Sequence, residues 1–295
     1  MNQQQQQWSR RSFLQRVAVA GAGVALLRGA PAADGFKPLV GVCRGNKDAA
    51  DMQTAGYDFL EGNVGGLFVP DKPEAEFEKN LAQLKGLVIP VLAVNGFLPG
   101  GMKIVGPDAN HDAAAKYAEN ALRRAGLANI KTVVFGSGGA RKIPEGFDAA
   151  KAREQFIAFA KRIAPAAEQA GVMLALEPLN RKETNFINSI TEGAALVDAV
   201  AHPAFKLHAD VYHMLQEDEQ PDAIAKAGAR IVHVHVAQKG SRIAPMPGGT
   251  DFRPYFKALK GIGYRGKVSL ECGWKKGETD PAKACAFIRE QWATA

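Results

Sequence analysis

Residues 206–236 read KLHADVYHMLQEDEQPDAIAKAGARIVHVHV, and this stretch decides the fold. A short β-rich run ends at Asp210, a helical stretch lies near residues 219–228, and a second apolar run at 232–236 carries His235 close to its end. Strand, helix and strand in this order predict a βαβ unit, in which the two strands are parallel. Asp210 and His235 lie 25 residues apart, about the length of one strand–helix repeat.

The same alternation extends in both directions from this unit. Strands are expected at 39–43, 57–61, 88–94, 132–135, 173–177, 206–210, 232–236 and 267–271. Helices are expected near 47–55, 72–86, 110–126, 148–170, 191–201, 219–228, 251–262 and 280–292. This pattern predicts an α/β fold, a closed (β/α)8 TIM barrel forming a single domain over residues 37–295. An open doubly wound sheet would need a glycine-rich phosphate turn after the first strand, and Cys43-Arg44-Gly45-Asn46 is not one.

Two further expected strands also end in ionisable side chains, Glu177 in Leu-Ala-Leu-Glu-Pro and Glu271 in Val-Ser-Leu-Glu-Cys. In a parallel barrel the carboxyl ends of neighbouring strands meet at one mouth, and strand residues two apart share a face. Glu177, Asp210, His235 and Glu271 are therefore expected on the inner face together. Three carboxylates gathered there repel one another unless a divalent cation lies between them. The oxygen-rich set predicts Mn²⁺ first, with Co²⁺ or Mg²⁺ as alternatives.

Polar residues also lie just beyond these strand ends, where the active-site loops of a barrel are found: Glu183, His213 and Arg242. The motifs Leu-Glu-Pro-Leu-Asn-Arg with Glu183, Asp-Val-Tyr-His-Met, His-Val-His-Val-Ala with Arg242, and Ser-Leu-Glu-Cys resemble those of the xylose isomerase-like TIM barrels. That superfamily holds sugar and sugar-phosphate isomerases and epimerases, tagatose/psicose 3-epimerases and hydroxypyruvate isomerases. The resemblance runs from about Lys37 to the end and is strongest from Glu177 onward.

The resemblance implies roles for the site residues. The cation ligands would be Glu177, Asp210, His235 and Glu271. Glu177 and Glu271 would also exchange protons with substrate carbons on opposite faces. Substrate hydroxyl and carbonyl oxygens would be held by Glu183, His213 and Arg242. Glu61 resembles a position that often lines the substrate pocket, and a loop anchor is an equal alternative.

The expected activity is that of an isomerase, either an aldose–ketose isomerase or a ketose epimerase, acting on a small carbohydrate. Removal of a proton next to a carbonyl gives an enediolate, whose charge a divalent ion stabilises as a Lewis acid. Three alternatives stay open: a hydroxypyruvate isomerase-like enzyme, a metal-dependent lyase or hydrolase of keto-glycosides, and a non-catalytic exported sugar-binding protein. A DNA-repair endonuclease of this superfamily is disfavoured, because its extra metal ligands include early histidines and His111 is the only histidine before residue 202.

The glycine-rich segment Gly136-Ser137-Gly138-Gly139-Ala140-Arg141 follows the fourth expected strand. It has two interpretations, a phosphate cradle completed by Arg141 or an ordinary loop at the barrel mouth. It does not match Gly-x-x-x-x-Gly-Lys, so the loop interpretation is favoured.

Residues 1–32 resemble a twin-arginine export signal. Ser9-Arg10-Arg11-Ser12-Phe13-Leu14 precedes an apolar stretch of 11 residues at 17–27, and Ala30-Pro31-Ala32 has the small residues of a cleavage site. We therefore expect recognition by the twin-arginine export machinery, cleavage near Ala32 and a periplasmic protein. The apolar stretch is too short for a stable membrane anchor.

Removal of this signal changes the charge. Because residues 1–32 hold four arginines and no acid, the formal net charge of +7 falls to +3. The high isoelectric point is then weak evidence for a nucleic-acid partner, and none is expected. An exported enzyme meets unphosphorylated sugars, which favours a neutral ketose or keto-sugar as substrate. Whether the protein forms a homo-oligomer stays open.

Overall fold

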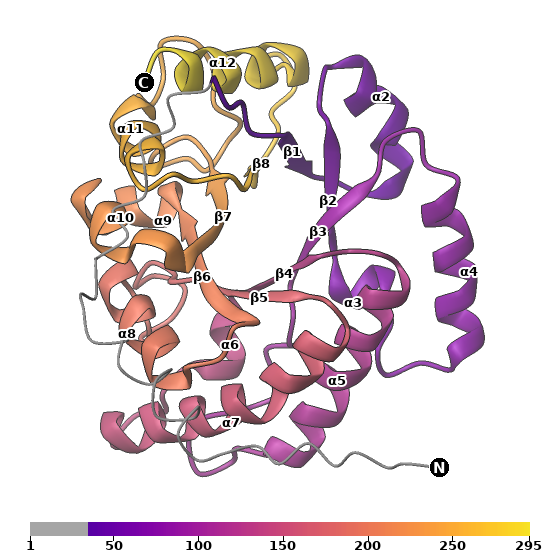
Figure 1. The fold of residues 1–295 in the computed structure, drawn as a ribbon, viewed down its shortest axis with the longest axis vertical. Coiled ribbons are helices and arrows are strands. Elements are labelled where there is room, and N and C mark those ends of the chain that lie inside the picture. Colours follow the sequence, from indigo (N-terminus) through magenta and orange to yellow (C-terminus); the bar gives the residue numbers. More distant parts are fainter. Residues whose placement is uncertain (1–34) are drawn as a thin grey trace, which may run out of the picture.

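The computed structural model describes residues 35–295, so the export signal expected at residues 1–32 lies outside the described residues. Eight parallel strands close into a barrel in the order of the sequence (Figure 1). They are β1 (Val40–Cys43), β2 (Phe59–Asn63), β3 (Val91–Asn95), β4 (Thr132–Phe135), β5 (Met173–Leu176), β6 (Phe205–Asp210), β7 (Ile231–Val236) and β8 (Lys267–Leu270). The prediction of a (β/α)8 barrel is confirmed.

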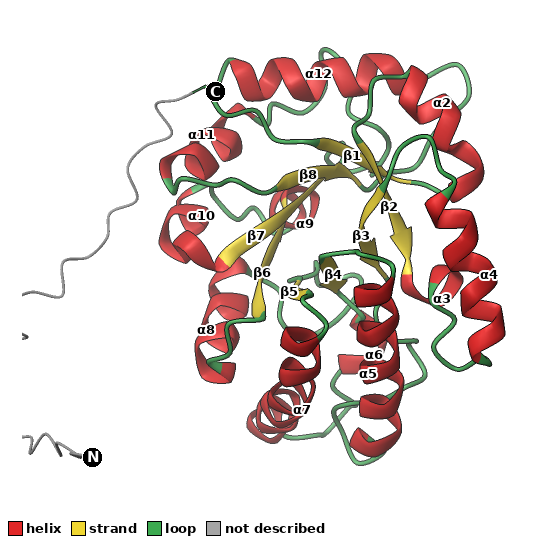
Figure 2. Ribbon diagram, turned by 45° about the vertical axis from the view of Figure 1, so that its right-hand side comes forward, coloured by secondary structure: helices red, strands yellow, loops and turns green. Residues whose placement is uncertain are grey.

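Helices surround this barrel on its outside (Figure 2). The eight expected ones are α2 (Ala49–Thr54), α4 (Glu74–Lys85), α5 (His111–Leu127), α7 (Ala149–Gln169), α8 (Ile190–Val200), α10 (Asp222–Ala227), α11 (Arg253–Gly261) and α12 (Pro281–Ala293). Three short helices were not expected: α3 (Val64–Leu67), α6 (Gly138–Arg141) and α9 (Val211–Gln216). They follow β2, β4 and β6 within a few residues and belong to the loops at the barrel mouth.

The second and third strands begin later than the sequence predicted. The expected ranges were 57–61 and 88–94, whereas β2 begins at Phe59 and β3 at Val91. Gly56 adopts a positive φ of 91° and turns the chain, and the Asp58 carboxylate then accepts a hydrogen bond from Val40 N at 2.7 Å. β2 also continues two residues past its expected end, to Asn63, so Glu61 lies in the middle of the strand with its side chain inside the barrel.

Several helix starts follow from local sequence. Asn110, Asp148, Ser189 and Asp280 each precede a helix and accept a hydrogen bond from a backbone amide of its first turn. Such N-caps satisfy amides that have no partner within the helix and contribute about 1 kcal/mol each. The caps fix where α5, α7, α8 and α12 begin.

The strand register determines which side chains meet inside the barrel. In the β6–β7 pair, His208 lies opposite His233 and Asp210 lies opposite His235. In the β7–β8 pair, His235 lies opposite Ser269. The intervening residues Ala209 and Val234 are completely buried under the helices. The expected parity is confirmed, since the polar residues of β6 and β7 lie on one face.

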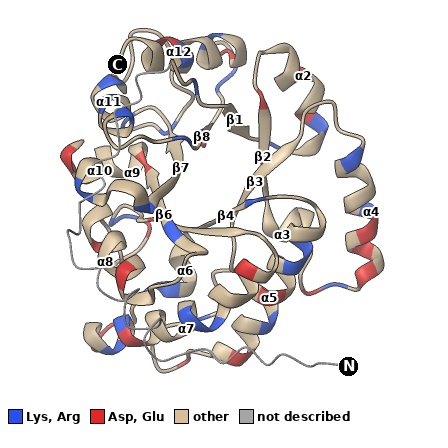
Figure 3. Ribbon diagram, in the orientation of Figure 1, with Lys and Arg blue, Asp and Glu red and all other residues tan. Residues whose placement is uncertain are grey.

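The charged residues lie mainly on the outer helices, and both signs occur on the same helix, for example on α4 and α7 (Figure 3). Among residues 35–295, no helix is both long and apolar enough to cross a membrane.

Candidate metal and active site

Four predicted residues meet at the carboxyl-end mouth of the barrel: Asp210 on β6, His235 on β7, and Glu177 and Glu271 directly after β5 and β8. The His235 Nδ1 atom lies 3.4 Å from Glu271 Oε2 and 3.7 Å from Glu177 Oε1. Asp210 is the cross-strand neighbour of His235. Three of the four side chains are buried, and that of Glu271 is one quarter exposed. The structure thus brings all four predicted residues together.

Three atoms of this cluster have the properties of cation ligands. Glu177 Oε1, Asp210 Oδ2 and His235 Nδ1 are buried and have no hydrogen-bond partner among the residues described. Ligand atoms of these three residues and of His208 lie within 4.8 Å of one another. Burial of polar atoms without partners is costly, and it is costlier still for carboxylates. Carboxylate oxygen and imidazole nitrogen are ligand types of divalent transition metals, so the residues fit such a cation.

Glu61 fixes the orientation of the His235 ring from the other side of the barrel. Its Oε1 atom lies 2.8 Å from His235 Nε2, and its Oε2 atom lies 2.8 Å from His233 Nε2. Burial alone would raise the pKa of Glu61, but His235 and His233 outweigh it and hold the pKa well below its usual value. The ionised carboxylate accepts from both rings, so the Nδ1 atom of His235 faces the cluster. Carboxylate–histidine pairs of this kind commonly orient metal ligands.

His208 and His233 form a buried layer with His235, and the sequence analysis did not assign them a role. Both are completely buried, and the His208 ring lies 4.2 Å from the His235 ring between centroids. Burial and the neighbouring histidines lower the pKa of His208 well below its usual value, so the ring is neutral. The signal was present in the sequence, because each residue stands two positions before a predicted ligand and so shares its face.

The carboxylates of the cluster have different proton affinities. Burial raises the pKa of Glu177, and burial raises that of Asp210 to about 6. Glu271 is also buried, yet the positive charge of His235 at 3.4 Å, followed by the charge of Arg242, lowers its pKa to about 2. The strand ends therefore combine a fully ionised carboxylate with carboxylates that accept a proton more readily.

Arg242, Glu183 and His213 form a connected rim above the cluster. Arg242 donates to Glu271 Oε2 at 2.6 Å and to Glu183 Oε1 at 2.9 Å. Asn180, which the sequence analysis did not single out, donates its side-chain amide to Glu183 Oε1 at 3.1 Å. The backbone amide of Asn180 donates to His213 Nδ1 at 3.3 Å. His213 Nε2 then carries the ring proton, 3.5 Å from Asp210 Oδ2, and points toward the cluster.

A cavity of about 440 Å³ adjoins the cluster on the side of β1, β2 and β3. Its lining includes Cys43, Glu61, Asn63 and Asn95, and it reaches outward past Gly45. Asn95 joins it to the cluster by donating to Glu271 Oε1 at 3.0 Å. The volume lies within the range of about 300–1,000 Å³ that is typical of small-molecule sites. Asn95 is another residue that sequence reasoning missed, since a single amide at a strand end carries little signal.

The glycine-rich segment after β4 contains the short helix α6, and its arginine is used within the fold. Arg141 is completely buried and donates to the backbone carbonyls of Glu177 at 2.7 Å and Phe135 at 3.4 Å. A Cβ atom on Gly136 would lie 2.3 Å from Glu177 Oε2. The glycine thus permits close approach to Glu177, and Arg141 is committed to strand-end carbonyls. Arg141 is therefore not free to complete a phosphate cradle, which agrees with the favoured loop interpretation.

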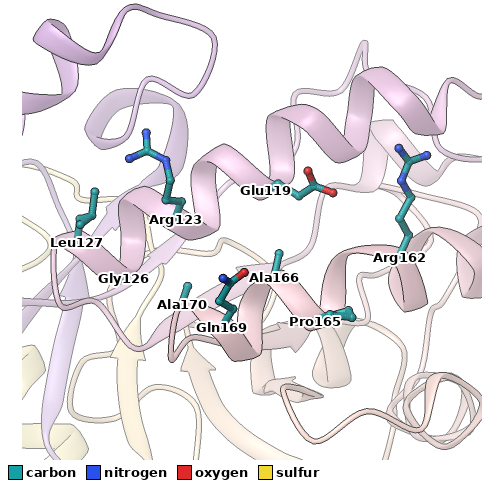
Figure 4. Close-up of a pocket in the computed structure, with 9 residues that line it drawn as sticks. All are labelled: Glu119, Arg123, Gly126, Leu127, Arg162, Pro165, Ala166, Gln169 and Ala170. Carbon is teal, nitrogen blue, oxygen red and sulfur yellow. The ribbon is translucent and has the colours of Figure 1, made fainter.

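A larger cavity, of about 700 Å³, lies on the outer surface between α5 and α7 (Figure 4). Glu119, Arg123 and Arg162 stand around it, and Leu127 lies at one end (Figure 4). Its lining contains none of the predicted site residues. The chemistry of the cluster is therefore confined to the barrel mouth.

Residues 49–291 match the family described as xylose isomerase-like TIM barrel. The chain belongs to this family. The L-ribulose 3-epimerase of Methylomonas sp. (strain DH-1) is 38% identical over 120 residues, which cover 40% of this chain and 42% of the relative. The ketose 3-epimerase of Arthrobacter globiformis is 33% identical over 150 residues, covering 44% of this chain and 52% of the relative. The chain thus spans about half the length of the curated relatives it matches.

Solved structures of sugar 3-epimerases match over a longer range. D-allulose 3-epimerase from Methylomonas sp., in complex with D-allulose, has a TM-score of 0.69 and 25% identity. The match covers 87% of this chain and 98% of the other. D-psicose 3-epimerase from Clostridium cellulolyticum H10 has a TM-score of 0.71 at 22% identity, covering 86% and 96%, and shows a shared fold.

Proposed function

We propose that this barrel is a divalent-metal-dependent sugar epimerase that inverts a ketose at the carbon next to the carbonyl. The observation that carries this proposal is the pair of carboxylates, Glu177 and Glu271, on either flank of one buried ring nitrogen, His235 Nδ1. The similarity to ketose 3-epimerases supports the substrate class and the position of the reacting carbon. A non-catalytic sugar-binding protein has no need of such a pair.

The cation would be held by Glu177, Asp210, His235 and Glu271. A bound divalent cation supplies Lewis-acid polarisation of the substrate carbonyl and offsets the negative charge of the enediolate. We retain the expectation of Mn²⁺, with Co²⁺ or Mg²⁺ as alternatives.

Epimerisation needs two proton-transfer groups, because a proton leaves one face of the carbon and another returns on the opposite face. Glu177 and Glu271 suit these two roles, since they come from β5 and β8 and enclose the strands that carry Asp210 and His235. Asn95 and Arg242 hold the Glu271 carboxylate through both its oxygens. That fixation positions the group for transfer at a defined carbon.

The rim residues would bind substrate oxygens. His213 presents its Nε2 proton toward the cluster, and Arg242 lies against Glu271, so both are placed to donate to a carbonyl or hydroxyl oxygen. Glu183 would accept from a hydroxyl. The cavity beside Asn95 would receive the part of the sugar that does not react. For Glu61 we propose orientation of His235 rather than substrate contact, since both its oxygens are bonded to histidines.

The test is proton exchange in deuterated water. Purified protein is stripped of metal, reloaded separately with Mn²⁺, Co²⁺ or Mg²⁺, and incubated with ketoses, aldoses, hydroxypyruvate and keto-glycosides. We expect metal-dependent deuterium incorporation at the carbon next to the carbonyl of a ketose, together with its epimer. Exchange with hydroxypyruvate alone would identify the hydroxypyruvate isomerase alternative. Cleavage of a keto-glycoside would identify the lyase or hydrolase alternative, and metal binding without any exchange would leave a binding protein.

Export through the twin-arginine pathway, cleavage near Ala32 and a periplasmic location remain part of this proposal. They rest on the sequence of residues 1–32. Replacement of Arg10 and Arg11 by lysine in the full chain should retain the protein inside the cell, measured by fractionation in a bacterial host.

A further inference from the structure

The His208 ring is a buried polar group that lacks the partners such a group needs. It is completely buried, and neither ring nitrogen has a hydrogen-bond partner within residues 35–295. A neutral imidazole carries one donor and one acceptor, and leaving them unpaired costs about 1–3 kcal/mol each. A group of this kind in a folded protein calls for an explanation such as an ion or a bound water.

The ring is aimed at the metal cluster. His208 Nε2 lies 3.5 Å from Glu177 Oε1, an atom that is itself buried without a partner. Ligand atoms of Glu177, His208, Asp210 and His235 lie within one 4.8 Å group. The β6 strand places His208 and Asp210 on the same face, two residues apart, so one strand offers two ligands side by side.

Glu271 differs from His208 in this respect. Its Oε1 atom accepts from Asn95 and its Oε2 atom accepts from Arg242, so both oxygens already have partners. His208 therefore has two unpaired ring nitrogens, whereas Glu271 has no unpaired oxygen. His208 was nevertheless not among the four metal ligands that the sequence predicted.

We propose that His208 is a further ligand of the cation and gives the site two imidazole nitrogens, His208 and His235. This inference rests on the metal site in the proposed function. A second nitrogen ligand changes the preference of the site, because affinity for imidazole rises from Mn²⁺ to Co²⁺ and is low for Mg²⁺. The site therefore discriminates more strongly for Co²⁺ over Mn²⁺ and Mg²⁺ than a set of three carboxylates and one imidazole.

The experiment counts the coordinated imidazoles directly. The full chain is loaded with Co²⁺, and the imidazole N–H protons shifted by the paramagnetic ion are counted by proton NMR. We expect two in the wild type and one in His208→Leu. The matched control is His233→Leu, which removes an equally buried histidine of the same layer whose ring is bonded to Glu61, and two signals should remain.

Chelator competition gives a second readout that does not depend on activity. His208→Leu and the more conservative His208→Gln should each weaken Co²⁺ binding by at least about 10-fold, because even loss of a group that only orients a metal ligand costs about 10–100-fold. The ratio of Co²⁺ to Mg²⁺ affinity should fall in both variants. If His208→Leu does not fold, two measurements still test the role of His208: the number of shifted imidazole signals in the wild type and the Co²⁺ affinity of His208→Gln.

The possible results separate the two proposals. A single shifted imidazole signal in the wild type, or unchanged Co²⁺ affinity in His208→Gln, overturns the role of His208 and leaves a core histidine satisfied by water. Failure of the wild type to bind Co²⁺, Mn²⁺ or Mg²⁺ at all overturns the metal site itself, and with it the proposed function.

Discussion

The two halves of the barrel bring different chemistry to the same mouth. Strands β5 to β8 deliver Glu177, Asp210, His235 and Glu271, all ionisable and crowded around one ring nitrogen. Strands β1 to β3 deliver mainly neutral side chains to the cavity of about 440 Å³, among them Cys43, Asn63 and Asn95. Arg44 and Glu61 are the charged residues of this lining, and the Glu61 carboxylate reaches across the barrel to the histidines of β7.

This difference separates two tasks that share one substrate. Crowded carboxylates are tolerable where a cation and proton transfer use them, and the β5–β8 half supplies that arrangement. Neutral amides with open space suit sugar hydroxyls, which need hydrogen bonds without strong charge. We infer that the second half carries the reaction and the first half contributes to substrate selectivity.

The largest effect is expected from the carboxylate pair. Glu177→Gln or Glu271→Gln removes a proton-transfer group, so solvent exchange should fall by about 10²–10⁴-fold while the circular dichroism spectrum stays native. The control is Glu119→Gln at the outer cavity between α5 and α7, which should leave exchange unchanged. Wild-type exchange rates in either cluster variant would remove that residue from the mechanism.

Glu61 connects the two halves, and its replacement should weaken metal binding. In Glu61→Gln the amide cannot accept from both His233 and His235, so the His235 ring loses its fixed orientation. We expect metal affinity to fall by about 10–100-fold, measured by chelator competition. Unchanged affinity together with a raised KM for the ketose would instead restore the expectation that Glu61 contacts substrate.

A smaller effect is expected from filling the β1–β3 cavity. Gly45 lines it with an ordinary φ of −72°, and a Cβ atom there would meet no described atom within 4 Å. Gly45→Phe should raise KM for a six-carbon ketose by about 10-fold, the scale of a lost pocket contact, and should change kcat less. Gly261→Phe on α11, where the space is equally open, is the matched control. Equal effects of the two substitutions would mean that the cavity does not bind substrate.

The smallest effect is expected for the ion pairs between α4 and α5, on the outer surface of the barrel, and it concerns stability at low pH. Hydrogen bonds from Arg123 and Arg124 lower the pKa of Glu74 to about 2, below its unfolded value near 4.5. Because the folded pKa is depressed, the stabilisation is complete above the unfolded pKa and is lost as the pH falls toward 2. The Glu74 side chain is 45% exposed to solvent, which screens its ion pairs, so less than about 1 kcal/mol is expected. In the wild type the urea midpoint of unfolding should fall between pH 5 and pH 3, and in Glu74→Gln this fall should be smaller. A variant midpoint that is lower by the same amount at every pH would contradict the role of the Glu74 carboxylate.

Much of this architecture was accessible from sequence, because strand and helix periods are local properties. The alternation of runs predicted all eight strands, and parity placed His208 with Asp210 and His233 with His235. The limits of β2 were less accessible, since they depend on the turn at Gly56 and on the bond from Val40 to Asp58. β2 also ends at Asn63 instead of residue 61, which places Glu61 in the strand interior.

The contacts across the barrel were not accessible, because they join residues that are far apart in the chain. Glu61 and His235 are separated by 174 positions, and Asn95 and Glu271 by 176. Nothing in the local pattern of either segment identifies its partner. The same holds for Arg141, whose position in a glycine-rich loop suggests anion binding until its backbone partners are known.

The sequence by itself determined the barrel and the set of strand-end residues, because side-chain alternation and repeat length act within a few residues or one repeat. Tertiary structure alone decided which of those side chains have free ligand atoms. Closure of the barrel gives Glu271 two partners and leaves His208 with none described. Hydrogen-bond satisfaction depends on atoms brought together by folding, and no pattern along the chain records it.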